Sequence, residues 1–259
     1  MVFRQRTHRA LQTALITVAL AATAHAARAC GTVSLGEGRV AAIADSRTLK
    51  LEDGRLIKLS GIESGASVDT VKAALRDLAQ GRPVTLKGAK TDPDRYGRLQ
   101  AFVSVSGSET PIQYALLERG LVLVGGRIGD RACAQALLGR EQAARAAGLG
   151  LWGQNGYRLH RSGEPAAILQ DQGRFAIVEG KVLSVRESGN TIYVNFGRRW
   201  SEDFTVTIAK RSESHFISGG LTPRSLSGQT VRVRGFVEER AGPWIEATQP
   251  EQFEIAGGR

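Results

Sequence analysis

The chain has 259 residues, of which 42% are hydrophobic and 23% are charged, a composition that excludes a disordered or fibrous protein. Its length allows one or two domains, each with a hydrophobic core. The formal net charge of +10 favours a partner that is a nucleic acid or another anionic surface. The position of this charge along the chain therefore bears on function.

Residues 1–26 have the pattern of a secretory signal peptide. Three arginines precede an apolar stretch over residues 10–24, which is shorter than the roughly 20 residues of a membrane span. Ala24 and Ala26 flank His25 as the small residues of a cleavage site. We therefore expect a periplasmic or secreted protein with no stable membrane span after cleavage.

Cleavage of this segment changes the charge distribution. The formal net charge falls from +10 to +7, because the segment contains three arginines and no acid. Residues 27–160 then hold 19 Lys and Arg against 13 Asp and Glu, whereas residues 161–259 hold 13 against 12. The basic surplus of the mature chain lies in its first half, which is where contact with a polyanion is expected.

Cys30 and Cys133 are the two cysteines of the chain. An oxidising compartment favours a disulfide between them, and the alternative is two unpaired thiols. Such a bridge closes a loop of about a hundred residues and would stabilise the fold by up to ~4–5 kcal/mol. Two cysteines so far apart do not have metal-ligand spacing. Arg28 argues against processing of Cys30 as a lipoprotein.

The first half of the mature chain predicts five strands and three helices. Asp53-Gly54 indicates a hairpin turn between the second and third strands. Leu137, Leu138 and Ala144 are expected on the inner face of the last helix. One helix follows the third strand, an order that suits a small closed barrel of the OB type. The predicted strands are residues 38–44, 48–51, 56–59, 84–87 and 99–105, and the predicted helices are 68–80, 112–119 and 132–147.

The second half repeats this order of strands. Residues 156–173 are polar without a clear period and are predicted to be a linker. Val231, Val233 and Phe236 indicate a half-buried strand. A second five-stranded OB-like barrel over residues 174–257 is expected, so the fold class is mainly β with two small barrels. The predicted strands are residues 175–185, 191–195, 203–208, 231–237 and 244–247, with a short helix over 212–218.

Several blocks of the first half resemble staphylococcal nuclease-like domains of the thermonuclease family. They match in order and spacing over about residues 36–153, and the expected domain covers residues 30–155. The resemblance implies an OB-type barrel with three helices that cleaves DNA and RNA phosphodiesters with Ca²⁺. The segment after residue 174 looks like the OB-like extension found in some exported bacterial relatives. The matching blocks are Ala44–Leu51, Gly61–Glu63, Asp94–Arg98, Leu116–Leu121 and Glu141 followed by Gly150–Trp152.

The resemblance implies a catalytic site that is only partly preserved. Arg98 matches a catalytic arginine, whereas Lys58 stands at the other arginine position and lacks the planar fork for bidentate phosphate contact. Arg47 replaces a metal-binding aspartate of the family. Glu63 keeps a carboxylate at a second ligand position, and Ala66 stands where the general base belongs. We therefore expect Arg98, Lys58 and Glu63 to form a degenerate site.

The sequence offers few candidate ligands for a metal ion. Asp45 and Glu63 are the candidate ligands, with Ca²⁺ as the cofactor if the nuclease site is functional. Together with Asp69 they could also form a rearranged site. Arg95 and Tyr96 match positions that contact nucleotide in the family, and a cation beside an aromatic face suits phosphate and base. The alternative for Tyr96 is a turn residue whose ring packs on the barrel.

One further stretch, Tyr193–Trp200, interleaves aromatic residues with Arg198 and Arg199. This pattern is typical either of a nucleic-acid platform or of a β-hairpin with core aromatics and solvated arginines. The four histidines are scattered and indicate neither a metal site nor a Ser–His pair.

Three hypotheses of function follow from the sequence. The first is an exported nuclease-like protein that binds nucleic acid or another polyanion with weak or no hydrolysis. The second is an active divalent-metal-dependent nuclease that uses Arg98, Lys58 and Glu63. The third is an envelope scaffold that binds protein.

Overall fold

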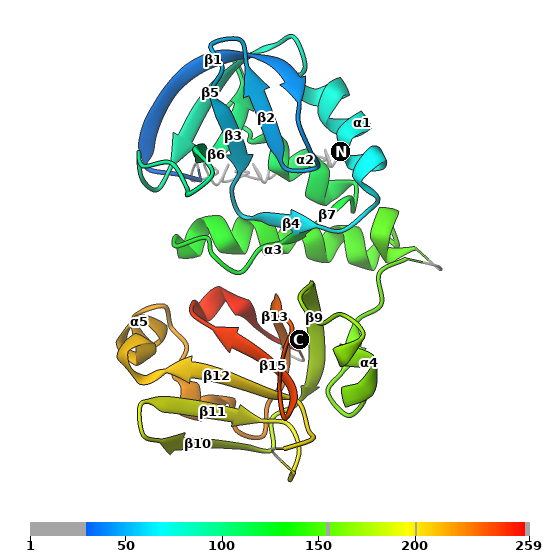
Figure 1. Cartoon of the computed structure of the whole chain (residues 1–259), viewed down its shortest axis with the longest axis vertical. Helices are drawn as coiled ribbons and strands as arrows, with labels where there is room; N and C mark the ends of the chain where they lie inside the picture. The colour runs from blue at the N-terminus through cyan, green and yellow to red at the C-terminus, as the bar shows by residue number, and fades with distance from the viewer. Residues whose placement is uncertain (1–29, 154–155, 200, 257–259) are drawn as a thin grey trace, which may run out of the picture.

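The computed structural model describes residues 30–153, 156–199 and 201–256. The predicted signal peptide lies outside these residues. No helix within them is long and apolar enough to cross a membrane. Figure 1 shows two β-rich parts with helix α3 (Arg131–Ala146) between them. We call them the first part, residues 30–153, and the second part, residues 156–256.

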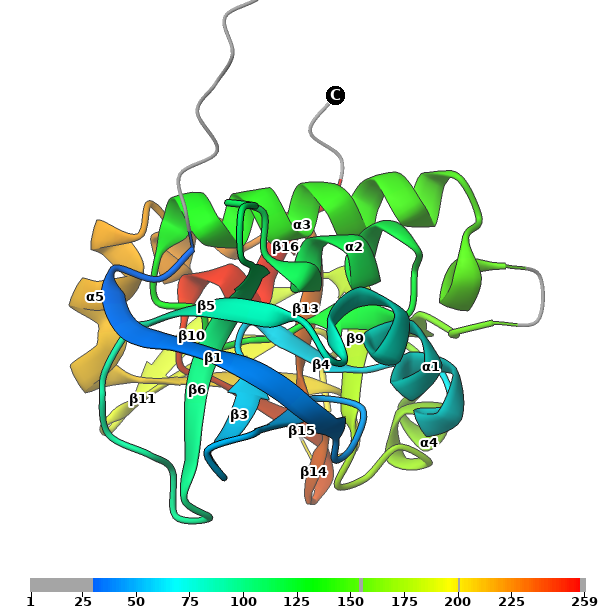
Figure 2. The same ribbon diagram turned by 90° about the horizontal axis from the view of Figure 1, so that it is seen from above.

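The first part contains the predicted closed barrel, with strand order β1-β2-β3-β6-β5. The long strand β1 pairs with both β2 and β5, and its register shifts once along each pairing. Such bulges bend a strand, so one strand reaches both edges and closes the barrel. Figure 2 shows β1 sweeping across the barrel. The strands are β1 (Val33–Ile43), β2 (Thr48–Leu51), β3 (Leu56–Leu59), β5 (Pro83–Gly88) and β6 (Arg98–Val105).

Three helices cover the barrel, as predicted: α1 (Val68–Ala79), α2 (Ile112–Glu118) and α3. The Ser67 hydroxyl accepts a hydrogen bond from the backbone N–H of Thr70, and Asp130 caps α3 in the same way. These side chains satisfy N–H groups that the first turn leaves free. Leu137 and Ala144 are buried and Leu138 is partly buried against the core.

The disulfide between Cys30 and Cys133 is present, with the two Cα atoms 5.0 Å apart. It ties the start of the described chain to the first turn of α3. Both cysteines are buried in the core of the first part.

The second barrel is not confirmed. The strands of the second part form two sheets, ordered β10-β11-β12-β15-β14 and β16-β13-β9-β8. The run predicted as one strand over 175–185 divides, because the Val182 N–H bonds to Gln229 and the Leu183 N–H bonds to Asn195. The chain therefore leaves one sheet and enters the other between β9 and β10. The bounds are β8 (His160–Arg161), β9 (Phe175–Lys181), β10 (Ser184–Ser188), β11 (Thr191–Asn195), β12 (Thr205–Ala209), β13 (Thr230–Phe236), β14 (Glu238–Arg240), β15 (Gly242–Ala247) and β16 (Phe253–Ile255).

The segment predicted to be a linker, residues 156–173, is structured. It contains β8, which pairs in parallel with β9, and helix α4 (Pro165–Leu169). Ile168 of α4 is fully buried in the core of the second part. The predicted helix after β12 is α5 (Glu213–Ser218). Two three-residue strands, β4 (Ile62–Ser64) and β7 (Val122–Val124), pair beside α3 and were not predicted.

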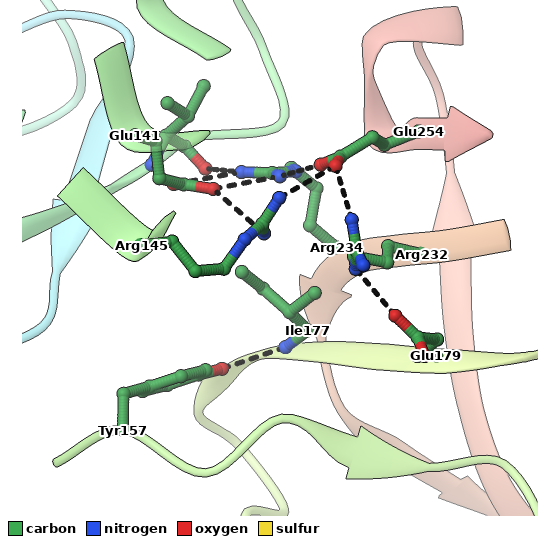
Figure 3. A network of polar contacts seen from close by, with 9 residues as sticks. Glu141, Arg145, Tyr157, Ile177, Glu179, Arg232, Arg234 and Glu254 are labelled. Atoms are coloured by element: carbon green, nitrogen blue, oxygen red, sulfur yellow. Dashed lines mark hydrogen bonds and ion pairs between the residues drawn. The ribbon is translucent and has the colours of Figure 1, made fainter. Parts of the chain in front are cut away.

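A buried polar network joins the two parts (Figure 3). Arg234 of β13 is fully buried, and its guanidinium donates to both carboxylate oxygens of Glu141 on α3 at 3.0 and 3.1 Å. It also donates to the Val124 carbonyl at 3.1 Å. Glu254 of β16 accepts from Arg145 of α3 at 2.8 Å. These contacts fix the four-stranded sheet against α3.

Candidate nucleic-acid interface

Lys58 and Arg98 lie on neighbouring strands of the barrel. β3 and β6 run in parallel, with Leu56 opposite Arg98 and Lys58 opposite Gln100. Strand alternation buries Ile57 in the core and leaves Lys58 partly exposed. Lys58 and Arg98 therefore share one outer face of the barrel.

Asp94 holds the Arg98 side chain in place. One carboxylate oxygen of Asp94 accepts from Arg98 Nε and Nη2 at 3.0 and 2.8 Å. The other oxygen accepts from the backbone N–H groups of Tyr96 and Arg98 at 2.9 and 3.0 Å. The Arg98 guanidinium and these N–H groups lower the pKa of Asp94 to about 2. The turn is therefore organised by an ionised carboxylate.

Tyr96 projects from the same turn and is 62% exposed, so its ring is not packed into the barrel. The guanidinium carbons of Arg95 and Arg98 lie 4.8 and 5.1 Å from the ring centroid. An exposed aromatic ring in contact with two arginines can stack a base while the cations meet phosphate.

Arg47 and Glu63 form an ion pair next to these cations. The Arg47 guanidinium donates to a Glu63 carboxylate oxygen and, at 3.1 Å, to the Ile62 carbonyl. Burial raises the pKa of Glu63, although Arg47 and Lys58 oppose this effect. The predicted ligand carboxylate is thus occupied by an arginine of this chain.

The positive charges of two arginines act on Lys58. Burial, the positive charge of Arg47 and that of Arg98 lower the pKa of Lys58, while Glu63 and Asp94 act in the opposite direction. The charges of Arg98 and Glu63 thus both act on Lys58, and a role of these three residues in a degenerate site stays a prediction. Three cations and two carboxylates meet there, so these five residues carry a formal net charge of +1 and attract an anion.

These residues do not fit a Ca²⁺ ion. Glu63 is paired with Arg47, and a carboxylate oxygen of Asp45 accepts the Arg47 backbone N–H at 2.7 Å. Asp69 is exposed in the first turn of α1 and Ala66 is partly buried. No group of three or more His, Cys, Asp and Glu residues that could hold a metal occurs in the described part of the chain. A hard cation needs several oxygen ligands at one point.

The aromatic stretch of the second part is divided between core and surface. Phe196 packs against Phe204 with 4.9 Å between ring centroids, whereas Tyr193 is 36% exposed. Arg199 pairs with Glu202 at 3.0 Å. Trp200 lies outside the described residues. The contacts of Phe196 and Arg199 are those of a hairpin with a core aromatic and a solvated arginine.

The sequence analysis did not predict the exposed position of Phe236, an aromatic residue of β13. Phe236 was grouped with Val231 and Val233 on the buried face of β13, but it is 52% exposed. It lies an odd number of residues from both valines, so its side chain points to the opposite face. An aromatic residue on the otherwise polar face of a strand was the available signal.

Comparisons with known proteins agree with the fold of the first part. Residues 68–154 match the family model described as staphylococcal nuclease homologue. A search of curated proteins gave no match. The matched segment runs from α1 through β6 and α3, and it includes Arg95, Tyr96 and Arg98. The match and the closed barrel together support a staphylococcal nuclease-like domain.

Proposed function

We propose that this protein binds nucleic acid or another polyanion through the nuclease-like barrel, with weak or no phosphodiester hydrolysis. One observation supports the proposal most strongly: Arg95 and Arg98 lie against the exposed Tyr96 ring, and the charge of Arg98 also acts on Lys58, while Arg47 is paired with Glu63. Cations beside an aromatic face suit binding of phosphate and base.

Hydrolysis has less support from the same residues. Attack on a phosphodiester needs an oriented water and a base, and Ala66 supplies no carboxylate at the position that the resemblance assigns to the base. Lys58 contributes charge but cannot donate two parallel hydrogen bonds to a phosphate. The residues of the candidate interface can therefore bind a nucleic acid more readily than they can hydrolyse its phosphodiester bonds.

Salt-dependent binding is the direct test. Fluorescence anisotropy with labelled single-stranded DNA and RNA should give an affinity that falls as salt rises, because phosphate contacts release counterions. Lys58→Met should weaken binding and reduce the salt slope by about 1. Lys87→Met is the matched control, since Lys87 is an exposed strand lysine of the same barrel. Absence of salt-dependent binding would favour a protein-binding scaffold.

A cleavage assay separates binding from catalysis. The mature protein is incubated with DNA and RNA, with and without Ca²⁺, beside an Arg98→Ala variant. The proposal expects little cleavage in every sample. Robust Ca²⁺-dependent cleavage that disappears in Arg98→Ala would instead establish an active nuclease.

The proposal includes export to the periplasm or the medium. Residues 1–26 carry the signal pattern, and the Cys30–Cys133 disulfide suits an oxidising compartment. Expression of the full chain in a bacterial host, followed by fractionation and N-terminal sequencing, should find a chain that begins near residue 27. The OB-like character of the second part also belongs to this proposal.

A further inference from the structure

A cleft of about 570 Å³ lies between the two parts of the molecule. Arg47 and Glu63 line it from the first part, and Arg158, Arg174, Phe175 and Phe236 are among the residues that line it from the second. Its volume falls within the range of about 300–1,000 Å³ that is usual for small-molecule sites. It is therefore large enough for a nucleotide.

The strand pair β9–β13 places two aromatic side chains in this cleft. On the strand face that meets the first part, Arg234 lies opposite Ile177, and both are fully buried. The next pair on the same face is Phe236 opposite Phe175, with ring centroids 5.5 Å apart. Phe236 is 52% exposed, so this pair extends past the buried interface and presents an aromatic surface.

The interface beside this pair is held by buried contacts. Within the second part, the Tyr157 hydroxyl accepts a hydrogen bond from the Ile177 backbone N–H at 2.8 Å (Figure 3), and the Tyr157 ring packs against Trp152 of the first part with 5.6 Å between ring centroids. Ile177 also packs in an apolar cluster with Leu123 and Leu151 of the first part. The walls of the cleft are thus fixed relative to each other, which lowers the entropic cost of ordering them around a ligand.

The charges of the cleft favour an anion. Its carboxylates are already engaged, since Glu63 pairs with Arg47, and Asp171 meets His160 Nε2 at 2.7 Å. The Arg174 side chain is 78% exposed, and its contact with Asp171 is long, at 3.8 Å. Arg158, 70% exposed, pairs with Glu164 at the surface. Exposed pairs of this kind are weak, so both arginines can turn toward phosphate.

Two residues of the cleft, Arg47 and Glu63, also interact with Lys58 of the candidate interface on the barrel. A chain of nucleotides that follows Tyr96, Arg98 and Lys58 therefore reaches Arg47 and then the aromatic pair. A base can stack on Phe236 only when it is unpaired, which excludes the interior of a duplex.

We propose that this cleft is a base-binding subsite for single-stranded nucleic acid, formed jointly by the two parts. The inference rests on the proposed function, because it assumes that the polymer binds along the barrel. Phe236 and Phe175 supply the stacking surface, and Arg174 and Arg158 supply phosphate contacts at its rim.

The test compares substitutions at Phe236 in the full mature protein. Phe236→Leu keeps an apolar contact with Phe175 but removes the aromatic face, and it should weaken binding of a single-stranded DNA 12-mer by about 10-fold. Phe236→Tyr should keep nearly full affinity. Ile217→Ala is the matched control, because Ile217 on α5 is also 52% exposed and does not line the cleft. Circular dichroism and thermal unfolding establish that each variant is folded.

The subsite and the proposed function fail in different ways. If wild-type protein binds and Lys58→Met weakens binding while Phe236→Leu does not, the subsite is overturned and the barrel interface stands. If wild-type protein shows no salt-dependent binding, the proposed function itself is overturned. A second readout is 2-aminopurine placed at successive positions of the oligonucleotide, whose fluorescence should be quenched at one position in wild type and restored in Phe236→Leu.

Discussion

At the residue scale, the candidate interface is defined by charges that the fold holds close together. The pKa of Lys58 is lowered by burial and by the charges of Arg47 and Arg98, and Glu63 and Asp94 offset part of this effect. Like charges at close range oppose folding unless a ligand or an acid compensates them. A site that binds an anion therefore carries a small cost in stability, and that cost can be measured.

Replacement of Lys58 by Met should separate stability from binding. The folded state disfavours the charged lysine, so Lys58→Met should raise the free energy of unfolding at pH 7 by up to about 0.5 kcal/mol. The difference should shrink as the pH rises toward 10.5, because the lysine of the folded protein then loses its proton. Urea unfolding of the two proteins at pH 7 and pH 10 measures the difference in the free energy of unfolding and its change with pH. A destabilised variant at pH 7 would contradict the argument.

Asp94 should give the opposite pH dependence. Its pKa is lowered from 3.8 to about 2 by Arg98 and by two backbone N–H groups. Its contribution to stability is thus fully present above about pH 4 and is lost as the pH falls toward 2. Asp94→Asn should be less stable than wild type at pH 6, and the two proteins should converge near pH 2. The matched control is Asp92→Asn, an exposed acid two residues away.

At the element scale, strands and helices with a clear period were predictable and very short elements were not. The runs that became β2, β3 and β11 carry enough alternation to define both ends. Strands β4, β7 and β8 have three, three and two residues, too few to show a period. The partners of these strands decide their structure, and partners distant in sequence cannot be inferred from local pattern.

The same distinction applies to the candidate site. Arg98, Lys58 and Glu63 could be grouped in advance because a family resemblance assigned each a position. The ion pair between Arg47 and Glu63, and the cleft residue Phe236, depend on how separate elements meet. The segment over 156–173 was predicted to be a linker because its helix, α4, has five residues and its strand, β8, has two, and elements this short show no clear period.

The disulfide provides a prediction at this scale. It joins the start of the described chain to α3 across a sequence separation of 103 residues. Cys30→Ser with Cys133→Ser should lower the free energy of unfolding by about 2–4 kcal/mol, since long loops gain conformational freedom when released. Denaturant unfolding of the double variant, compared with wild type under oxidising and reducing conditions, measures the loss. If the free energy of unfolding of the wild-type protein were the same with and without reductant, the predicted contribution of the disulfide would be contradicted.

At the scale of the whole molecule, the two parts are joined by charge as well as by apolar packing. The carboxylate of Glu141 and the guanidinium of Arg234 are both almost completely excluded from solvent, and Glu254 extends the network to Arg145 and Arg232. Burial tends to raise the pKa of Glu254, but Arg145 and Arg234 outweigh it and the pKa is lowered. Such a network is costly to break from one side, because it leaves a buried charge without a partner.

Arg234→Met should therefore both destabilise the protein and open the cleft. The substitution leaves the buried Glu141 with the Val124 N–H and a long contact of 4.0 Å to Arg145, and loss of its main ionic partner should cost about 3–5 kcal/mol. The double variant Arg234→Met with Glu141→Leu removes both charges and should recover most of that stability.

The same substitution should affect binding of single-stranded DNA, because Phe236 follows Arg234 on the same strand face. Loss of the interface should weaken binding in the single variant, and the double variant should restore it. Arg186→Met, on the other sheet of the second part, is the control. Equal stability of the single and double variants would contradict a buried ion pair, and unchanged DNA binding by a destabilised single variant would separate the cleft from this interface.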